Sequence, residues 1–147
     1  MSDLTSSPLD PLPYDLDAQV GYLLRLASQR HAAIFQAHAV QGLTPTQFTT
    51  LLRISEQGDV SQNHLGRLGA MDVATVKGVV DRLRAKALVQ SRPDPRDKRR
   101  SIISLTQAGA ALIAVLKAAG HVITEETLAP LDPEERALLV ALLAKIT

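Results

Sequence analysis

Apolar residues recur along this chain at the three- and four-residue spacing of amphipathic helices. From Leu16 to about His38 they form one continuous stripe, which predicts a long first helix. Thr44, Pro45 and Gln47 are expected to begin a second helix, because a threonine cap, a proline in the first turn and a glutamine three residues after the cap form a capping box. Gly58 is expected to end that helix.

Two shorter helices and a pair of strands are predicted next. Ser61 is expected to cap a short third helix, and Asp72 a fourth helix that ends near Lys86, with a tight glycine-containing connection between them. This is a helix-turn-helix pattern, which alone is weak evidence because many helical proteins contain one. Residues 88–92 and 101–105 are predicted to be strands on either side of a charged tip, so the pattern becomes a winged helix.

The C-terminal third of the chain is also predicted to be helical. Thr106 is expected to cap a helix that runs to about Leu128, and Asp132 to begin a last helix with Leu139 and Leu143 on its apolar face. The first and the last two helices offer more apolar surface than a small winged module can cover. The chain is therefore expected to form a homodimer through them.

The fold class that follows is mainly α: a winged helix-turn-helix with a two-stranded β wing, flanked by N- and C-terminal helices that form a dimerisation region. Residues 1–15 are expected to be a flexible arm and residues 16–147 a single domain. Within that domain, residues 43–105 would form the winged lobe, and residues 16–42 and 106–147 the dimerisation helices.

Composition supports helices and excludes several chemistries. Of the 147 residues, 46% are apolar but only 3% are aromatic, a balance that favours helices packed through Leu and Ala over a β-sandwich. The absence of cysteine excludes disulfides, thiolate zinc sites and cysteine-based redox sensing. No apolar run is expected to span a membrane and no secretory signal is expected, which predicts a cytoplasmic, nucleoid-associated protein without a membrane partner.

Positive charge is concentrated in one segment of a nearly neutral chain. The formal net charge is +1, yet between Arg82 and Arg100 eight Lys or Arg residues stand against only Asp94 and Asp97. Such a segment is an electrostatic footprint for phosphates, although a solvated basic loop is the alternative. Its position at the tip of a hairpin directly after a helix-turn-helix favours double-stranded DNA as the partner.

Several motifs in a fixed order cover about half of the chain. They are Leu43-Thr44-Pro45-Thr46-Gln47, Ala74-Thr75-Val76-Lys77, Val80-Asp81-Arg82-Leu83, Leu88-Val89, Asp97-Lys98-Arg99 and Leu105-Thr106-Gln107-Ala108-Gly109. In this order and spacing the chain resembles the MarR family of bacterial transcription regulators. Gly66, Gly69 and Gly78 depart from the family pattern, which leaves base contacts at position 78 open. The chain is more faintly similar to a subgroup that includes regulators of nicotinate degradation, through Gln19-Val20-Gly21, Arg30-His31, Ser61-Gln62-Asn63 and Ala70-Met71-Asp72.

The resemblance implies roles for residues of the winged lobe. The fourth helix would enter the major groove of DNA through its N-terminal positions Val73, Ala74, Thr75 and Lys77; for Thr75, completing the helix cap is the alternative. The wing would enter the minor groove, where Asp97 would brace the tip and Arg99 would insert. Phosphates would be contacted by Arg96, Lys98 and Arg100.

The resemblance also implies an effector, because small aromatic acids commonly bind this family where the dimer helices meet the winged module. We expect a small aromatic carboxylate, of the hydroxynicotinate kind. Arg25 or His31 could pair with the carboxylate, and Tyr22 or Phe48 could pack on the ring. An arginine on a long helix is more often solvated or in an interface salt bridge, which is the alternative.

Nothing in the sequence indicates catalysis. It has no Gly-rich phosphate loop, no Gly-x-Ser-x-Gly motif and no carboxylate pair with a plausible pocket, so neither an enzyme nor a cofactor is expected. His31 and His38 lie seven residues apart on one helix face, but without cysteines or clustered carboxylates no metal site is predicted. The leading hypothesis is a repressor that an aromatic acid releases from a pseudo-palindromic operator; the alternative is an effector-independent architectural DNA-binding protein.

Overall fold

The computed structural model describes residues 12–147. Residues 1–11, the greater part of the expected arm, lie outside the described residues. The elements in order are the 3-10 turn η1 (Leu16–Ala18), α1 (Val20–Ala37), α2 (Pro45–Gln57), β1 (Val60–Ser61), α3 (Gln62–Leu68), α4 (Val73–Ala85), β2 (Val89–Pro93), β3 (Ser101–Leu105), α5 (Gln107–Thr127) and α6 (Pro133–Lys145). The first helix is therefore shorter than expected, because extended backbone at Gln19 separates it from the 3-10 turn.

The helix starts follow the capping residues that the sequence offered. The Thr44 side chain accepts from the Gln47 amide at 3.2 Å, while the Gln47 carboxamide accepts from the Thr44 amide at 3.1 Å, so the capping box is formed. Ser61, Asp72 and Thr106 each accept from the backbone amide three residues later, at the starts of α3, α4 and α5. The predicted starts of α2, α3, α4 and α5 are confirmed.

The predicted two-stranded wing is confirmed as β2 and β3, and a third strand that the sequence did not predict, β1, completes the sheet. β3 pairs antiparallel with β2 on one side and with β1 on the other, in the order β1-β3-β2. Val60 lies opposite Ile103, and Ser61 opposite Ile102. A two-residue strand is too short to show an alternating pattern. The pairing of β1 with β3 joins the start of α3 directly to the wing.

The hydrophobic core lies inside the winged lobe. Side chains from α2, α3, α4, the sheet and the first half of α5 form one buried cluster, whose largest fully buried members are Leu51, Ile54, Leu65, Leu83, Ile103, Leu116, Val80 and Val89. Gly109 allows α5 to approach the lobe, because a Cβ at this position would collide with the carbonyl oxygen of Leu88. The winged lobe is thereby fixed to the start of α5.

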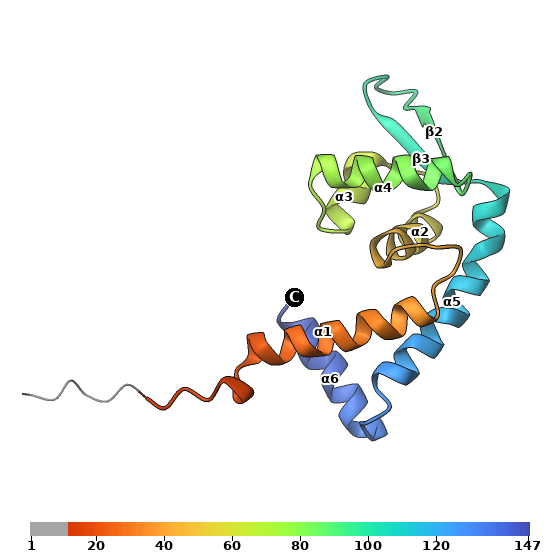
Figure 1. The fold of residues 1–147 in the computed structure, drawn as a ribbon. Coiled ribbons are helices and arrows are strands. Elements are labelled where there is room, and N and C mark those ends of the chain that lie inside the picture. The colour runs from red at the N-terminus through yellow and green to blue at the C-terminus, as the bar shows by residue number, and fades with distance from the viewer. Residues whose placement is uncertain (1–11) are drawn as a thin grey trace, which may run out of the picture.

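The terminal helices are far less covered than the lobe. Figure 1 shows the lobe at one end of α5, and α1 and α6 at the other. Phe35 is the only buried residue of α1, and α6 has none. Large apolar side chains such as Val20 and Leu138 are 68% and 58% exposed. A single chain therefore leaves uncovered the two apolar faces that the sequence assigned to self-association.

Helix α5 corrects one expectation about membranes. It is long and apolar enough, by length and composition, to span a bilayer, although no such run was expected from the sequence. The run was missed because its many alanines are only weakly apolar and Lys117 interrupts it. The core helix of a water-soluble protein passes the same test, and Leu112, Ile113 and Leu116 of α5 belong to the core of the lobe.

Candidate nucleic-acid interface and effector groove

Helix α4 presents its N-terminal half to solvent. Val76, Val80 and Leu83 are buried on one side, whereas Val73 is 75% exposed. The Asp72 carboxylate accepts from the Thr75 amide at 2.7 Å. This bond, with one from the Thr75 hydroxyl, lowers the pKa of Asp72. Thr75 thus completes the cap, and the helix offers an exposed, well-anchored first turn.

A lysine on the same exposed surface is held by a neighbour. The Nζ of Lys77 lies 2.8 Å from Oδ2 of Asp81, one helical turn later, and this ion pair lowers the pKa of the Asp81 carboxyl. Both side chains remain accessible to solvent. Exposed pairs of this kind are weak, so Lys77 is free to exchange Asp81 for a phosphate or a base edge.

The tip of the wing is folded by its own acidic residues. The Asp94 amide donates to the Arg100 carbonyl at 2.9 Å, and the Arg100 amide donates to the Asp97 carbonyl at 2.9 Å. The Asp97 carboxylate accepts from the Arg99 amide at 3.1 Å and from Arg99 Nε at 3.2 Å. These two bonds, the backbone one first, hold the pKa of Asp97 below its usual value. The Arg99 side chain nevertheless remains 92% exposed, so a braced turn projects a guanidinium into solvent.

Not every cation of the basic segment lies at this tip. Arg92 pairs with Asp59 at 2.7 Å and ties the wing to the loop before β1. The Nζ of Lys86, the residue that caps the C-terminus of α4, donates to the Gln41 carbonyl at 2.7 Å. These residues have structural partners. The cations that remain at the tip are Arg96, Lys98, Arg99 and Arg100.

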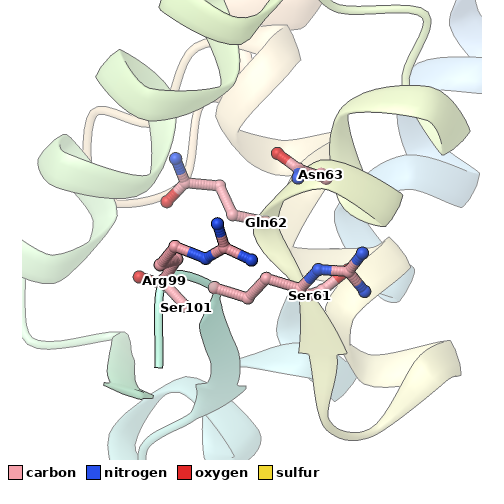
Figure 2. Close-up of a pocket in the computed structure, with 6 residues that line it drawn as sticks. Ser61, Gln62, Asn63, Arg99 and Ser101 are labelled. Carbon is pink, nitrogen blue, oxygen red and sulfur yellow. The ribbon is translucent and has the colours of Figure 1, made fainter. Parts of the chain in front are cut away.

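A small polar pocket lies between the wing and α3. Its volume is about 90 Å³, and it is lined by Ser61, Gln62, Asn63, Arg99, Arg100 and Ser101. Figure 2 shows the side chains of Gln62, Asn63 and Arg99 around it. The pairing of β1 with β3 brings these residues together across about forty positions of sequence. Gln62 and Asn63 were not predicted to contact DNA, because no local pattern in the sequence places them beside the wing.

The effector candidates on α1 do not share a cavity with Phe48 in the single chain. Tyr22 and Arg25 lie together on an exposed part of α1, with the guanidinium carbon 5.5 Å from the ring centre. His31 Nδ1 lies 2.8 Å from Thr127 Oγ1. It also lines an open apolar groove of about 450 Å³ between α1, α5 and α6. His38 contacts Glu126 instead, at 2.7 Å. The described residues 12–147 hold no group of three potential metal ligands.

Phe48 lies at a different groove, between α2 and α5. Its ring packs edge-on against Phe35, with centroids 5.5 Å apart. The groove measures about 280 Å³ and is lined by Phe48, Leu52, Leu116, Lys117, Gly120, His121 and Thr124. Gly120 faces the ring, because a Cβ there would lie 3.4 Å from Phe48 Cζ. An apolar floor with Lys117 and His121 at its edge suits an aromatic ring that carries a carboxylate.

The α5 residues of this groove were not among the effector-binding residues predicted from the sequence. A signal was present: Lys117, His121 and Thr124 follow one another at helical spacing on an otherwise Ala- and Leu-rich helix. Only the packing of α2 against α5 shows that this polar stripe faces Phe48.

Comparisons with known proteins agree with the fold and with the wing. Residues 41–100 match the model of the MarR family. The chain is 45% identical to the HTH-type transcriptional repressor NicR of Pseudomonas putida, over 97% of this chain and 90% of that protein. It is 47% identical to a probable transcriptional regulator from Pseudomonas aeruginosa of known crystal structure, with a TM-score of 0.87 over 90% of this chain and 100% of the other.

A third relative connects the fold to a ligand. The structure of Bordetella bronchiseptica BpsR, whose DNA binding is regulated by 6-hydroxynicotinic acid, is 41% identical to this chain. It superimposes with a TM-score of 0.85 and covers 91% of this chain and 96% of BpsR. The matched length spans both the winged lobe and the terminal helices.

Proposed function

Since the chain belongs to the MarR family of transcription regulators and is not an enzyme, we propose that it is a ligand-responsive repressor. It binds a pseudo-palindromic operator as a homodimer and leaves the operator when a small aromatic or heteroaromatic acid binds. It acts in the cytoplasm, and its association with the nucleoid follows from binding DNA.

The observation that carries the DNA half of this proposal is the exposed surface of the winged lobe. The first turn of α4 and the braced tip of the wing both project from the end of the molecule that lies away from α1 and α6 (Figure 1). Val73, Ala74, Thr75 and Lys77 would face the major groove. Asp97 would hold the tip while Arg99 enters the minor groove, and phosphates would be contacted by Arg96, Lys98 and Arg100.

The dimer half of the proposal rests on the uncovered apolar faces. The exposed side chains of α1 and α6, and the open apolar groove between α1, α5 and α6, suit a second copy of this chain. Residues 16–42 and 106–147 would then form the dimerisation region and residues 43–105 the DNA-binding lobe. Two α4 helices must reach successive major-groove faces, about 34 Å apart.

The effector half extends what is known of BpsR, whose DNA binding responds to 6-hydroxynicotinic acid. An acid of this class would place its ring against Phe48 and its carboxylate near Lys117 and His121. Tyr22, Arg25 and His31 remain candidates on α1. Because α5 carries both the lobe and the dimerisation region, a ligand wedged between α2 and α5 would change the spacing of the two α4 helices. A tenfold loss of DNA affinity needs about 1.4 kcal/mol of such coupling.

Footprinting on the DNA upstream of the protein's own coding sequence, combined with a ligand titration, tests the proposal. We expect two protected half-sites, and release by 6-hydroxynicotinate in preference to benzoate or hydroxycinnamates. The side chain that binds the carboxylate is identified by comparing three variants, Lys117→Ala, Arg25→Ala and His31→Ala. The variant that lacks this side chain should keep its operator affinity but need a higher ligand concentration for release.

Three results would contradict parts of the proposal. A protein that protects DNA but is released by none of these acids would be the architectural alternative. Sedimentation that shows a stable monomer at micromolar concentration would rule out the dimer. Normal release of all three variants would place the effector elsewhere.

A further inference from the structure

Every side chain that lines the polar pocket between the wing and α3 can donate a hydrogen bond. Its walls carry the two guanidinium groups of Arg99 and Arg100, the two carboxamides of Gln62 and Asn63, and the hydroxyls of Ser61 and Ser101. No carboxylate lines it (Figure 2). Its volume of about 90 Å³ corresponds to about three waters. The pocket therefore suits one tetrahedral oxyanion.

Most of these donors are free to serve a ligand. Asp97 engages Arg99 through Nε, which leaves other N–H groups of that guanidinium available. Arg100 Nε lies 3.8 Å from Asp97, too far for a hydrogen bond. Among the lining residues of the described chain, the side-chain hydrogen bonds are the one that Ser61 accepts from the His64 amide and the one that Arg99 Nε donates to Asp97. The carboxamides of Gln62 and Asn63 take no part in them.

The sheet fixes the two walls of the pocket relative to each other. Ser61 pairs with Ile102, the residue after Ser101, so the start of α3 and the base of the wing tip belong to one rigid unit. Arg92 and Asp59 add an ion pair between the same two segments, at 2.7 Å. The pocket thus lies between the helix pair that would enter a major groove and the tip that would enter a minor groove.

We propose that this pocket seats one phosphate of the DNA backbone, on the strand that separates the groove entered by α4 from the groove entered by the wing. The inference rests on the DNA-binding half of the proposed function. Gln62 and Asn63 donate to the non-bridging oxygens of that phosphate, and Arg100 supplies the positive charge. Such a contact adds affinity without reading sequence, and it fixes the register of α4 relative to the wing.

The test compares variants in which the pocket loses a donor or gains a charge. Gln62→Ala and Asn63→Ala should each weaken DNA binding about tenfold, because a hydrogen bond to a charged group is lost. Gln62→Glu introduces a carboxylate that pairs with the arginines and repels the phosphate. It should lower the salt dependence, the slope of log K against log salt, by about 0.9 per protomer although no cation has been removed. Gln107→Glu, the same change at an exposed position at the start of α5, should leave the slope unchanged.

Ethylation interference then locates the phosphate itself. With the wild type, ethylation of one backbone phosphate per half-site should block binding, and with Gln62→Ala that interference should disappear while the others remain. Titration of the free protein with inorganic phosphate at constant ionic strength distinguishes a second source. Occupation of the pocket by free phosphate at physiological concentration, with no change in the interference pattern of the variants, would show a site for the free anion and overturn the proposal.

The remaining outcomes separate this inference from the proposed function. If the wild type binds no DNA, the proposed function fails first. If the wild type binds DNA, and Gln62→Ala, Asn63→Ala and Gln62→Glu keep its affinity, slope and interference pattern, the phosphate seat is wrong while the repressor stands. Thermal unfolding of each variant by circular dichroism confirms that it is folded; Asn63, which is exposed, supplies a substitution outside the core.

Discussion

The winged lobe and the terminal helices bury their apolar residues in different ways. In the lobe, the side chains of Leu51, Leu83 and Ile103 are fully buried by the same chain. In α6 no residue is buried, and in α1 only Phe35 is. Both regions are helical and rich in Leu, so composition does not separate them. What separates them is the number of chain segments that surround each helix.

The difference shows that a single chain buries one hydrophobic core, in the winged lobe, but leaves the apolar faces of α1 and α6 exposed. The lobe gathers α2, α3, α4, three strands and half of α5 around one cluster. Helix α1 contacts α5 and reaches the lobe through Phe35 and Phe48, and α6 has no buried residue. Helices with large exposed apolar faces are stable when a partner covers them. Substitutions in the two regions should therefore respond differently to protein concentration.

The largest effect is expected in the closed core. Leu83→Ala should lower the free energy of unfolding by about 2–5 kcal/mol, and this loss should be the same at low and high protein concentration. Leu138→Ala on α6 acts only through a partner, so its loss should appear only at concentrations where the dimer forms. Urea unfolding at both concentrations measures this. Equal losses from Leu138→Ala at both concentrations would show that α6 is covered within its own chain.

The junction between the two regions should give the next effect. Gly109→Ala places a methyl group against the Leu88 carbonyl, so α5 must move away from the lobe. We expect a loss of stability of about 1–3 kcal/mol together with weaker operator binding. Gly78→Ala is the control for stability, because its Cβ would meet only the flexible guanidinium of Arg82, at 3.5 Å. It should stabilise α4 by up to about 1 kcal/mol. Unchanged unfolding of Gly109→Ala would mean that the junction is loose.

The wing tip lies outside both cores, so changes there should alter affinity and leave stability alone. Arg99→Ala should weaken operator binding by about 1–3 kcal/mol, and Lys98→Ala should mainly lower the salt slope by about one unit. Fluorescence anisotropy across a salt series measures both quantities, and thermal unfolding should not change. Equal operator affinity of wild type and Arg99→Ala at physiological salt would remove the wing from the mechanism.

The smallest effect concerns the brace at the wing tip. The backbone and side-chain hydrogen bonds from Arg99 hold the pKa of Asp97 in the folded protein below that of an unpaired aspartate. The stability that the brace contributes is therefore fully present above the unpaired pKa and is lost as the pH falls through the folded pKa. A carboxyl-carbon NMR titration should place the midpoint of Asp97 lower in the folded protein than in the urea-unfolded chain. Because Asp97 stays ionised near neutral pH, DNA binding there should not change with the titration of this group. In Arg99→Ala the pKa of Asp97 should rise only part of the way towards that of an unpaired aspartate, because the backbone amide of residue 99 still donates to the carboxylate. Equal midpoints in the folded and the unfolded wild type would show that the brace is absent.

The sequence alone determined the features that depend on neighbours three or four residues apart. Thr44 with Gln47, and Asp72 with Thr75, form the expected caps because a cap joins a side chain to an amide in the next turn. The acidic brace of the wing tip is equally local, since Asp97 bonds to Arg99. The uncovered faces of α1 and α6 could be predicted because the sequence shows more apolar surface than one small lobe can use.

Only the tertiary structure decided which distant segments meet. The two residues of β1 became a strand because Ile102 and Ile103 lie beside them. Gln62 thereby came to face Arg99 across the polar pocket. Phe48 lies beside Lys117 and His121 rather than beside Arg25, because α2 packs on the middle of α5. These contacts form only when the whole chain packs around its core. The sequence near each residue does not indicate which distant residue it will contact.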